Sequence, residues 1–221
     1  MVHATDITAL EPPRRKLDPE RTRLNILAAA YDEFAENGLN GARVDAIAAR
    51  TNTVKRMIYY YFGSKEGLYL AVLEQAYSAI RKAEDALELE RLPPEDAIRC
   101  MVEHTFDYHD AHPGFSRLVT IENIQQGRFI AQSLTIRAIN ITVVESLRAI
   151  LQRGQDEGVF RQDIDPIDVH MMISALAFFR VANRHTFGLL FNRDMSEPAL
   201  RAHHRSLVVE TVLRSLRQAG D

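Results

Sequence analysis

A stretch near the front of the chain combines side chains that suit contact with a polyanion. Residues Lys55–Glu66, KRMIYYYFGSKE, place two cations before three consecutive tyrosines and a second lysine just after a glycine. Three adjacent tyrosines cannot all face the core from one helix, because successive side chains point about 100° apart. Tyrosine hydroxyls, lysine and arginine all donate hydrogen bonds to phosphate oxygens. The stretch therefore predicts a surface for a partner rich in phosphate.

Charge is distributed unevenly along the chain. Residues 1–65 hold 10 lysines and arginines and 8 acids, whereas residues 66–221 hold 17 and 22. A local basic patch on an acidic body suits a polyanion that touches only one end. Charge alone leaves the alternative open that the patch is an ordinary solvated surface.

The apolar pattern predicts an all-α chain of about nine helices. Apolar residues recur at intervals of three and four throughout, and no window favours a strand. With proline, glycine and asparagine as breaks, we expect helices over residues 19–37, 44–51, 54–62, 66–90, 94–110, 114–126, 129–155, 166–190 and 197–218.

Composition limits the class of protein. The chain has 221 residues, of which 46% are hydrophobic and 26% charged, as in a soluble globular protein. The single cysteine, Cys100, excludes an internal disulfide and fits a reducing cytoplasm. The start of the sequence lacks the pattern of a secretory signal, and the longest apolar run, Met171–Phe179, is too short to cross a bilayer. We expect a cytoplasmic protein.

Three short helices at the front, with a tight turn between the second and third, predict a helix-turn-helix. The last helix of such a unit lies in the major groove of DNA. Ile58 and Phe62, four residues apart, are expected to face a small core with Val44, Ile47 and Ala48. The opposite face then presents Lys55, Arg56, Met57, Tyr59, Tyr60 and Tyr61. Lys65, where a further helix begins after Ser64, is placed to bind a phosphate.

Gly38 to Leu73, GLNGARVDAIAARTNTVKRMIYYYFGSKEGLYLAVL, resembles the DNA-binding domain of TetR/AcrR-type transcriptional regulators. The family pattern is a glycine, an Ile-Ala pair, a turn and a Tyr-x-x-Phe-x-x-Lys-Glu-x-Leu run. It is met by Gly38, Ile47-Ala48, Tyr59, Phe62, Lys65-Glu66 and Leu68. The resemblance implies phosphate contacts from Tyr59, Tyr61 and Lys65, groove contacts from Lys55, Arg56, Met57 and Tyr60, and positions near the DNA backbone for Arg43 and Asp45.

The sequence departs from the family pattern at three places. Arg43 replaces the Ser or Thr that usually caps the second helix, the turn is Thr51–Val54 instead of small-Gly-Val-Ser, and Arg56-Met57 replace small residues. We expect the fold to survive, because Asn52 tolerates a left-handed conformation and Thr53 can cap the next helix. The base sequence that is read does not follow from the family. Arg14–Lys16 form either a minor-groove arm or a solvated tail.

The resemblance also implies a division of the chain and an assembly. A mobile arm (1–18) precedes the helix-turn-helix domain (19–66) and a ligand-binding and dimerisation domain (67–221). The family dimerises through its last two long helices, here 166–190 and 197–218, and so reads a palindromic operator. The second of these carries more apolar surface than one protomer needs, at Leu200, Leu207, Val208, Val212 and Leu216. His203 and His204 beside them are expected at the surface or interface.

The middle helices of the family enclose a pocket for a small organic effector. Candidate ligand contacts are polar or aromatic residues set in apolar stripes, namely His104, Tyr108, Glu122, Asn123, Gln126, Asn140, Phe179 and Asn183. Phe106, Phe115, Phe129, Phe178 and Phe179 are candidates for the apolar walls. The alternative, that these buried polar groups satisfy one another, stays open. The segment His112–Gly127 resembles the branch of the family that senses small cyclic metabolites such as pyrimidines and aromatic acids.

These features predict a ligand-responsive repressor, with an activator or architectural DNA-binding protein of the same fold as the alternative. The sequence contains no Gly-rich phosphate loop, His-Glu-x-x-His or Gly-x-Ser-x-Gly, so we expect no enzyme activity and no cofactor. His104, His109 and His112, with Asp107 and Asp110, form one His/Asp cluster. Spacings of three and five do not bring three imidazoles together on a helix, so no metal site is expected.

Overall fold

The computed structural model describes residues 18–218, and this part of the chain is all-helical with no strand. It contains ten α-helices and two short 3-10 turns. The bounds are α1 (Pro19–Gly41), α2 (Val44–Arg50), α3 (Lys55–Phe62), α4 (Lys65–Asp85), η1 (Leu89–Arg91), α5 (Pro94–Ala111), α6 (Pro113–Ile124), η2 (Ile130–Gln132), α7 (Leu134–Asp156), α8 (Pro166–Ala182), α9 (Arg184–Phe191) and α10 (Pro198–Leu216). The predicted fold class is confirmed.

Two of the expected helices are interrupted, and the helix expected over 66–90 ends early, at Asp85. The helix expected over 166–190 ends at Ala182, because Asn183 leaves the helical conformation, and α9 starts anew after it. The helix expected from residue 129 begins only at Leu134, where Ser133 caps it by accepting a hydrogen bond from the Ile136 N–H at 3.0 Å. These breaks were missed because the apolar pattern continues through both of them.

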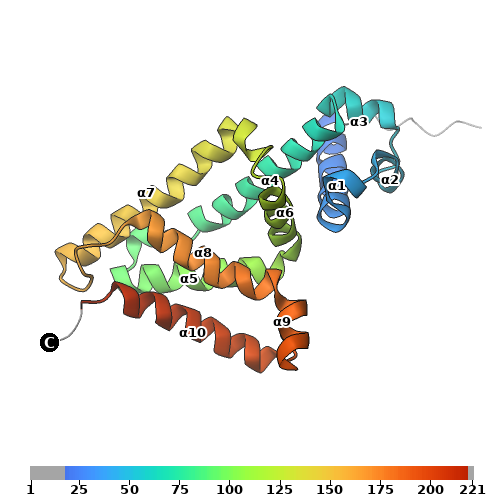
Figure 1. The fold of residues 1–221 in the computed structure, drawn as a ribbon. Coiled ribbons are helices and arrows are strands. Elements are labelled where there is room, and N and C mark those ends of the chain that lie inside the picture. Colours follow the sequence, from blue (N-terminus) through green and yellow to red (C-terminus); the bar gives the residue numbers. More distant parts are fainter. Residues whose placement is uncertain (1–17, 219–221) are drawn as a thin grey trace, which may run out of the picture.

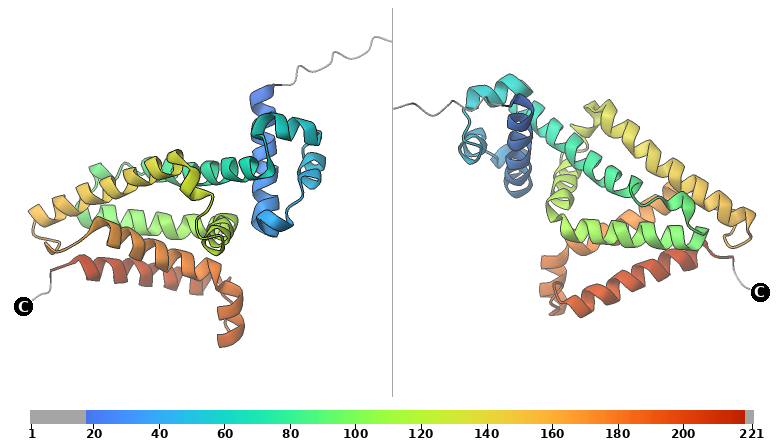
Figure 2. Two further views of the ribbon diagram at one scale, coloured as in Figure 1. Left: turned by 45° about the horizontal axis from the view of Figure 1, so that its top comes forward. Right: turned by 180° about the vertical axis from the view of Figure 1, so that it is seen from behind.

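The molecule has a small head and a larger body. Figure 1 shows α1, α2 and α3 together at one end, with α4 running from them into the body. In the body, α5 lies beside α8 and α10, and α7 covers the other side of α4 and α5. The two views in Figure 2 show α9 as a short crossing piece between the ends of α8 and α10.

Two hydrophobic cores hold these parts together. The first joins α1, α2 and α3 to the first half of α4 and to α6, around Phe34, Ile58 and Tyr69. The second joins α5, α7, α8 and α10, around Phe106, Leu147 and Phe160. Because α6 belongs to the first core and α8 packs against it, the head and the body share side-chain contacts on both sides of α6.

The breaks within the head depend on particular residues. Asn52 adopts φ +49° in the turn before α3, as its small polar side chain allows. Ser64 caps α4 by accepting the Gly67 N–H at 3.0 Å. A Cβ atom at Gly67 would lie 2.2 Å from the Phe62 carbonyl oxygen, so only glycine fits where the end of α3 meets α4. This close approach fixes the direction of α3 relative to α4, the helix that leaves the head.

Two expected local features differ in the structure. The residue that caps α3 is Val54, and no side chain caps this helix, so the prediction that Thr53 does so is wrong. Leu24, which its spacing from Leu27, Tyr31 and Phe34 predicts on the apolar stripe of the first helix, is 46% exposed. Thr53 is displaced from the cap position because α3 begins one residue later than expected, at Lys55.

No helix within residues 18–218 has the length and apolar character that crossing a bilayer requires.

Candidate functional site

The outer face of α3 is the most concentrated group of polar and aromatic side chains on the head. Ile58 is fully buried, and Phe62 packs against the same core, as predicted. On the other side, Tyr60 is 77% exposed and Tyr59 38% exposed. Lys55 and Arg56 are exposed as well, and Met57 and Tyr61 are half-buried. The helix therefore buries Ile58 and presents its two cations, Tyr59 and Tyr60 to solvent, while Tyr61 packs partly against the core of the head.

The cations of this surface are held only loosely. Lys55 Nζ lies 3.3 Å from the Asp45 carboxylate, and both side chains are about half exposed to solvent. Lys65 Nζ donates to the Asn40 carbonyl oxygen at 3.4 Å. An exposed pair of this kind contributes about 0–1 kcal/mol. A phosphate can therefore replace the Asp45 carboxylate beside Lys55, or the Asn40 carbonyl beside Lys65, at little cost in free energy.

A buried acid that the sequence analysis did not single out positions α2. Glu33 of α1 is only 4% exposed, and it accepts the Arg43 N–H at 2.9 Å. Its other oxygen lies 3.3 Å from Arg50 Nη2, at the far end of α2. Glu33 thus supplies from another helix the cap that Arg43 cannot provide from its own side chain. A glutamate on the apolar stripe of the first helix was the signal for this role.

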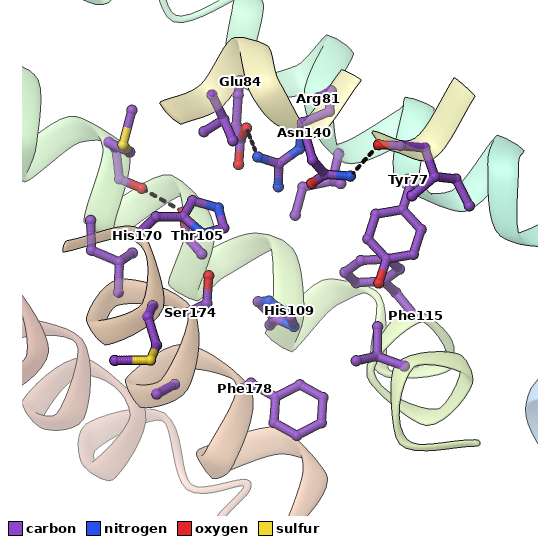
Figure 3. Close-up of a pocket in the computed structure, with 18 of the residues that line it drawn as sticks. Tyr77, Arg81, Glu84, Thr105, His109, Phe115, Asn140, His170, Ser174 and Phe178 are labelled. Atoms are coloured by element: carbon purple, nitrogen blue, oxygen red, sulfur yellow. Dashed lines mark hydrogen bonds and ion pairs between the residues drawn. The ribbon is translucent and has the colours of Figure 1, made fainter. Parts of the chain in front are cut away.

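The body contains a cavity of about 660 Å³ between five helices. Figure 3 shows its labelled side chains converging from α4, α5, α6, α7 and α8. One end is aromatic, with Tyr77, Phe115 and Phe178, and the other is polar, with Arg81 and Glu84. A volume of this size is typical of sites for small organic molecules.

The polar end is a buried ion pair. Nη1 of Arg81 lies 2.8 Å from Oε2 of Glu84, and each side chain is less than 10% exposed. Burial lowers the pKa of Arg81. The negative charge of Glu84 favours the cation and opposes this shift. Burial raises the pKa of Glu84 to about 7, although Arg81 opposes this rise. The pair is therefore much less firmly ionised than it would be in water.

Two histidines face the middle of the cavity. His109 Nδ1 lies 2.9 Å from the Ser116 hydroxyl, which joins α5 to α6. Burial lowers the pKa of His109 to about 4, and Arg81 acts in the same direction. Burial, followed by Arg81, also lowers the pKa of His170 on α8. Both imidazoles are neutral near pH 7, so Arg81 is the single lysine or arginine that can carry positive charge among the lining residues.

The predicted effector contacts are divided by the structure. Asn123 and Asn140 line the cavity, and each donates its amide N–H to a carbonyl on its own helix. The remaining predicted contacts lie outside the lining, namely His104, Tyr108, Glu122, Gln126, Phe179 and Asn183. Of the predicted apolar walls, Phe115 and Phe178 line it, whereas Phe106, Phe129 and Phe179 do not.

Glu122 has a structural role instead. Its carboxylate accepts the N–H groups of Phe129 and Ile130 at 3.1 and 3.0 Å, and it is 1% exposed. Gln126, at φ +57°, forms the turn after α6. Phe179 and Asn183 lie at the end of α8, away from the lining, and Phe179 is 53% exposed. The sequence pattern identified these residues as polar or aromatic side chains within apolar stripes, but it does not show whether they line the cavity.

The lining residues that the sequence analysis missed include the charged ones. Arg81 and Glu84 are three residues apart on the stripe of α4 that also carries Tyr77 and Ile80. Two charged residues on an apolar stripe were the available signal. His170 and Ser174 on α8 gave none, because that helix is apolar on most sides.

The His/Asp cluster on α5 is occupied by other contacts. His112 Nδ1 bonds to the Tyr108 carbonyl, and Asp107 and Asp110 pair with arginines of α8 and α10. Within the described residues, no group of three or more His, Cys, Asp or Glu side chains is placed to hold a metal ion. The aspartates instead join three helices of the second core.

Comparison with known proteins identifies the class. The family model for bacterial regulatory proteins of the tetR family matches residues 26–72, and a tetracyclin repressor-like C-terminal domain model matches residues 94–212. The chain belongs to the TetR family of transcriptional regulators, which are DNA-binding proteins without enzymatic activity.

The chain is similar to several named relatives. The HTH-type transcriptional repressor NicS of Pseudomonas putida is 37% identical over 204 residues, covering 92% of this chain and 96% of the relative. An HTH-type transcriptional repressor of Streptomyces coelicolor is 34% identical and covers 74% of this chain and 80% of its own length. A crystal structure of another Streptomyces coelicolor regulator has a TM-score of 0.67 at 29% identity, covering 88% of this chain and 98% of that one.

Proposed function

We propose that this chain is a ligand-responsive repressor that binds a palindromic operator as a dimer and leaves it when a small organic molecule fills the cavity. The observation that carries the proposal is the outer face of α3, where cations and tyrosines stand exposed on a helix anchored by Ile58. Its relatives named as repressors support the same reading. Because the target is DNA, we place its action in the cytoplasm.

The roles of the head residues follow from helix-turn-helix docking. With α3 in the major groove, Lys55, Arg56, Met57 and Tyr60 face the base edges. Tyr59, Tyr61 and Lys65 then flank the groove and donate to phosphates. Arg43 and Asp45, at the exposed start of α2, lie near the neighbouring DNA backbone. The Asp45 carboxylate repels phosphate. When DNA binds, the ion pair between Asp45 and Lys55 breaks and Lys55 becomes free to contact the DNA.

Dimerisation is assigned to α8 and α10, which lie side by side on the face of the body. Most apolar side chains of α10 are used within the protomer, since Val208, Val212 and Leu216 are buried. Phe179 on α8 and Leu207 on α10 are 53% and 50% exposed and remain for a partner. His203 is exposed beside Leu207, which suits an interface position. A two-fold dimer places two reading heads on successive turns of DNA, about 34–36 Å apart.

The link from cavity to head runs through α6. Phe115 lines the cavity, and a Cβ atom on its neighbour Gly114 would lie 2.8 Å from the ring of Tyr31 on α1. The start of α6 is thus packed against the head on one side and the cavity on the other. An effector that displaces Phe115 would shift α6 against α1. The coupling then equals the difference in the affinity of the effector for the two arrangements.

The test is selection from a random double-stranded DNA library by the purified protein at two salt concentrations. We expect a palindrome whose half-sites are about one helical turn apart, with affinity that falls steeply with salt. A variant with Tyr60→Ala should select a different or weaker half-site, whereas His203→Ala should keep the same half-site. Salt-sensitive binding without any enriched sequence would contradict the proposal. The position of the operator relative to a promoter then separates repression from activation.

A further inference from the structure

The guanidinium of Arg81 leaves one of its two-nitrogen edges without a partner at the wall of the cavity. Nη1 lies 2.8 Å from Glu84 Oε2 as an ion pair without hydrogen-bond geometry, and within residues 18–218 the fully buried Nε has no acceptor at all within reach. The side chain is 9% exposed. Figure 3 shows the guanidinium reaching between Glu84 and Asn140 into the polar end of the cavity. An unpaired buried N–H is costly, so this edge calls for an acceptor.

Other arginines of the molecule show what this edge does when it is satisfied. Arg205 donates from Nε to Oδ1 and Oδ2 of Asp107 at 3.2 and 3.1 Å, and from Nη2 to Oδ2 at 3.0 Å. Arg217 holds Glu95 through the same two nitrogens, at 2.7 and 3.2 Å. In both cases the fork of Nε and Nη2 takes a carboxylate, the geometry that arginine prefers. For Arg81 the described residues supply no carboxylate there.

The rest of the lining sets the size and charge of the missing group. Phe115, Phe178 and Tyr77 form a flat apolar end, a few side chains away from Arg81. Arg81 is the single lysine or arginine among the lining residues, and the pKa values of His109 and His170 are lowered by burial. One cation balances one negative charge, so a doubly charged phosphate ester fits poorly.

We propose that the effector is a small organic monoanion whose carboxylate binds the Nε and Nη2 edge of Arg81 and whose flat apolar body lies against Phe115 and Phe178. The inference rests on the proposed function, because it names the chemical class of the effector. The carbonyl oxygen of the Asn140 amide, whose N–H is engaged by Ile136, faces the same end and accepts a hydrogen bond from a ring N–H or hydroxyl on the ligand.

Glu84 changes its charge or position when an anion binds to Arg81. It neutralises Arg81 when the cavity holds no anion, at 2.8 Å from Nη1. When a second carboxylate arrives, Glu84 either takes up a proton or moves. A separate cavity of about 120 Å³ on its other side, lined in part by Thr142 and Ser146, gives the carboxylate somewhere to move. Either change alters α4, the helix that continues directly into the head.

The experiment measures binding of matched acids and amides to the full chain. The probes are benzoate, 2-naphthoate and 4-phenylbutanoate, each beside its primary amide, with dissociation constants from calorimetry and thermal unfolding as a second readout. We expect at least one acid to bind about tenfold or more tightly than its amide. Arg81→Gln should weaken that acid about tenfold or more, Arg81→Lys should weaken it less, and Glu84→Gln should leave it equal or tighter.

Arg217→Gln is the matched control, since it removes an arginine fork far from the cavity and should leave acid binding unchanged. Near-ultraviolet circular dichroism shows whether Arg81→Gln keeps its tertiary structure, and Arg81→Lys keeps the test valid if it does not. The inference is overturned by amides that bind as tightly as acids, by Arg81→Lys and Arg81→Gln that both bind as wild type does, or by no acid binding at about 10 mM. Operator selection with the same preparations decides the proposed function separately.

Discussion

The head and the cavity are two surfaces built in opposite ways. The proposed DNA contacts all lie between Arg43 and Lys65, on α2, α3 and the start of α4. The cavity takes its walls from five helices spread between Tyr77 and Phe178. The DNA-contacting residues lie in one short segment, so their spacing in the sequence is enough to predict which of them share the exposed face. A cavity depends instead on how distant helices pack, which a local pattern does not record.

The ion pairs of the two regions show the same contrast. Lys55 and Asp45 on the head lie 3.3 Å apart and are mostly solvated, so salt screens them and phosphate displaces them. Arg81 and Glu84 are closer, at 2.8 Å, and buried, so the pKa of each is shifted toward its neutral form. The exposed pair suits a partner that arrives from solvent with many charges. The buried pair suits a small partner that brings one.

The largest expected effect is on the joint that orients α3. In Gly67→Ala the new Cβ would lie 2.2 Å from the Phe62 carbonyl oxygen, which is backbone and cannot rotate away. We expect a loss of about 3–4 kcal/mol in the free energy of unfolding, together with loss of operator binding. Gly41→Ala is the control, because its Cβ would lie at an ordinary 3.5 Å from Asn37. Denaturant unfolding of both variants measures this, and equal stabilities would show that the joint is not rigid.

The next effect belongs to the cavity and depends on pH. Burial lowers the pKa of His109 from 6.5 to about 4, so the folded state holds fewer protons than the unfolded chain between these values. Its contribution to stability is present above pH 6.5 and is lost as pH falls toward 4, by at most about 3 kcal/mol. In His109→Asn this loss should vanish, so the stability difference from wild type should shrink over that window.

The comparison is between His109→Asn and wild type at each pH. Carboxylates are common to both proteins and cancel in the difference. A difference that stays flat between pH 6.5 and 4 would mean that water reaches the imidazole in the folded state.

These contrasts explain which parts of the structure were predictable. Apolar spacing and Pro, Gly and Asn breaks located most helices, since both signals are local. The break at Asn183 was missed because the apolar pattern of 166–190 continues across it. The exposed face of α3 was predicted correctly for its cations and for Tyr59 and Tyr60, because Ile58 fixes which side faces inward. Tyr61 was predicted on the same face but packs partly against the core.

The cavity was predictable only in part, for a physical reason. Asn140 stands out because it is polar within an apolar stripe, and it does line the cavity. Glu122 stands out in the same way, yet its carboxylate satisfies two backbone N–H groups after α6. A buried polar residue needs a partner, but the sequence does not say whether that partner is the backbone or a ligand. Only the packing of α4 against α5 and α7 identified Arg81.

A smaller effect tests how the head is held together. In Glu33→Gln the Arg43 N–H keeps an acceptor, but the charge contact with Arg50 at 3.3 Å is lost. Because Glu33 is buried and Arg50 is half exposed, we expect a loss of about 2 kcal/mol in unfolding free energy. Glu36→Gln, an exposed acid 3.8 Å from the same arginine, should cost far less. If both variants lose the same amount, the position of α2 does not depend on the buried acid.

The smallest effect separates phosphate contact from base reading on the head. Lys65→Ala removes a half-exposed cation at the start of α4, held at present only by the Asn40 carbonyl at 3.4 Å. We expect about 1 kcal/mol weaker binding to every DNA sequence alike, with a salt slope lower by about 1, because one released counterion is lost. Lys82→Ala makes the same charge change far along α4 and should change neither quantity. Titrations against the selected operator and a scrambled duplex at several salt concentrations measure both. A loss confined to the operator would mean that Lys65 reads sequence, and that α3 sits deeper in the groove than helix-turn-helix docking places it.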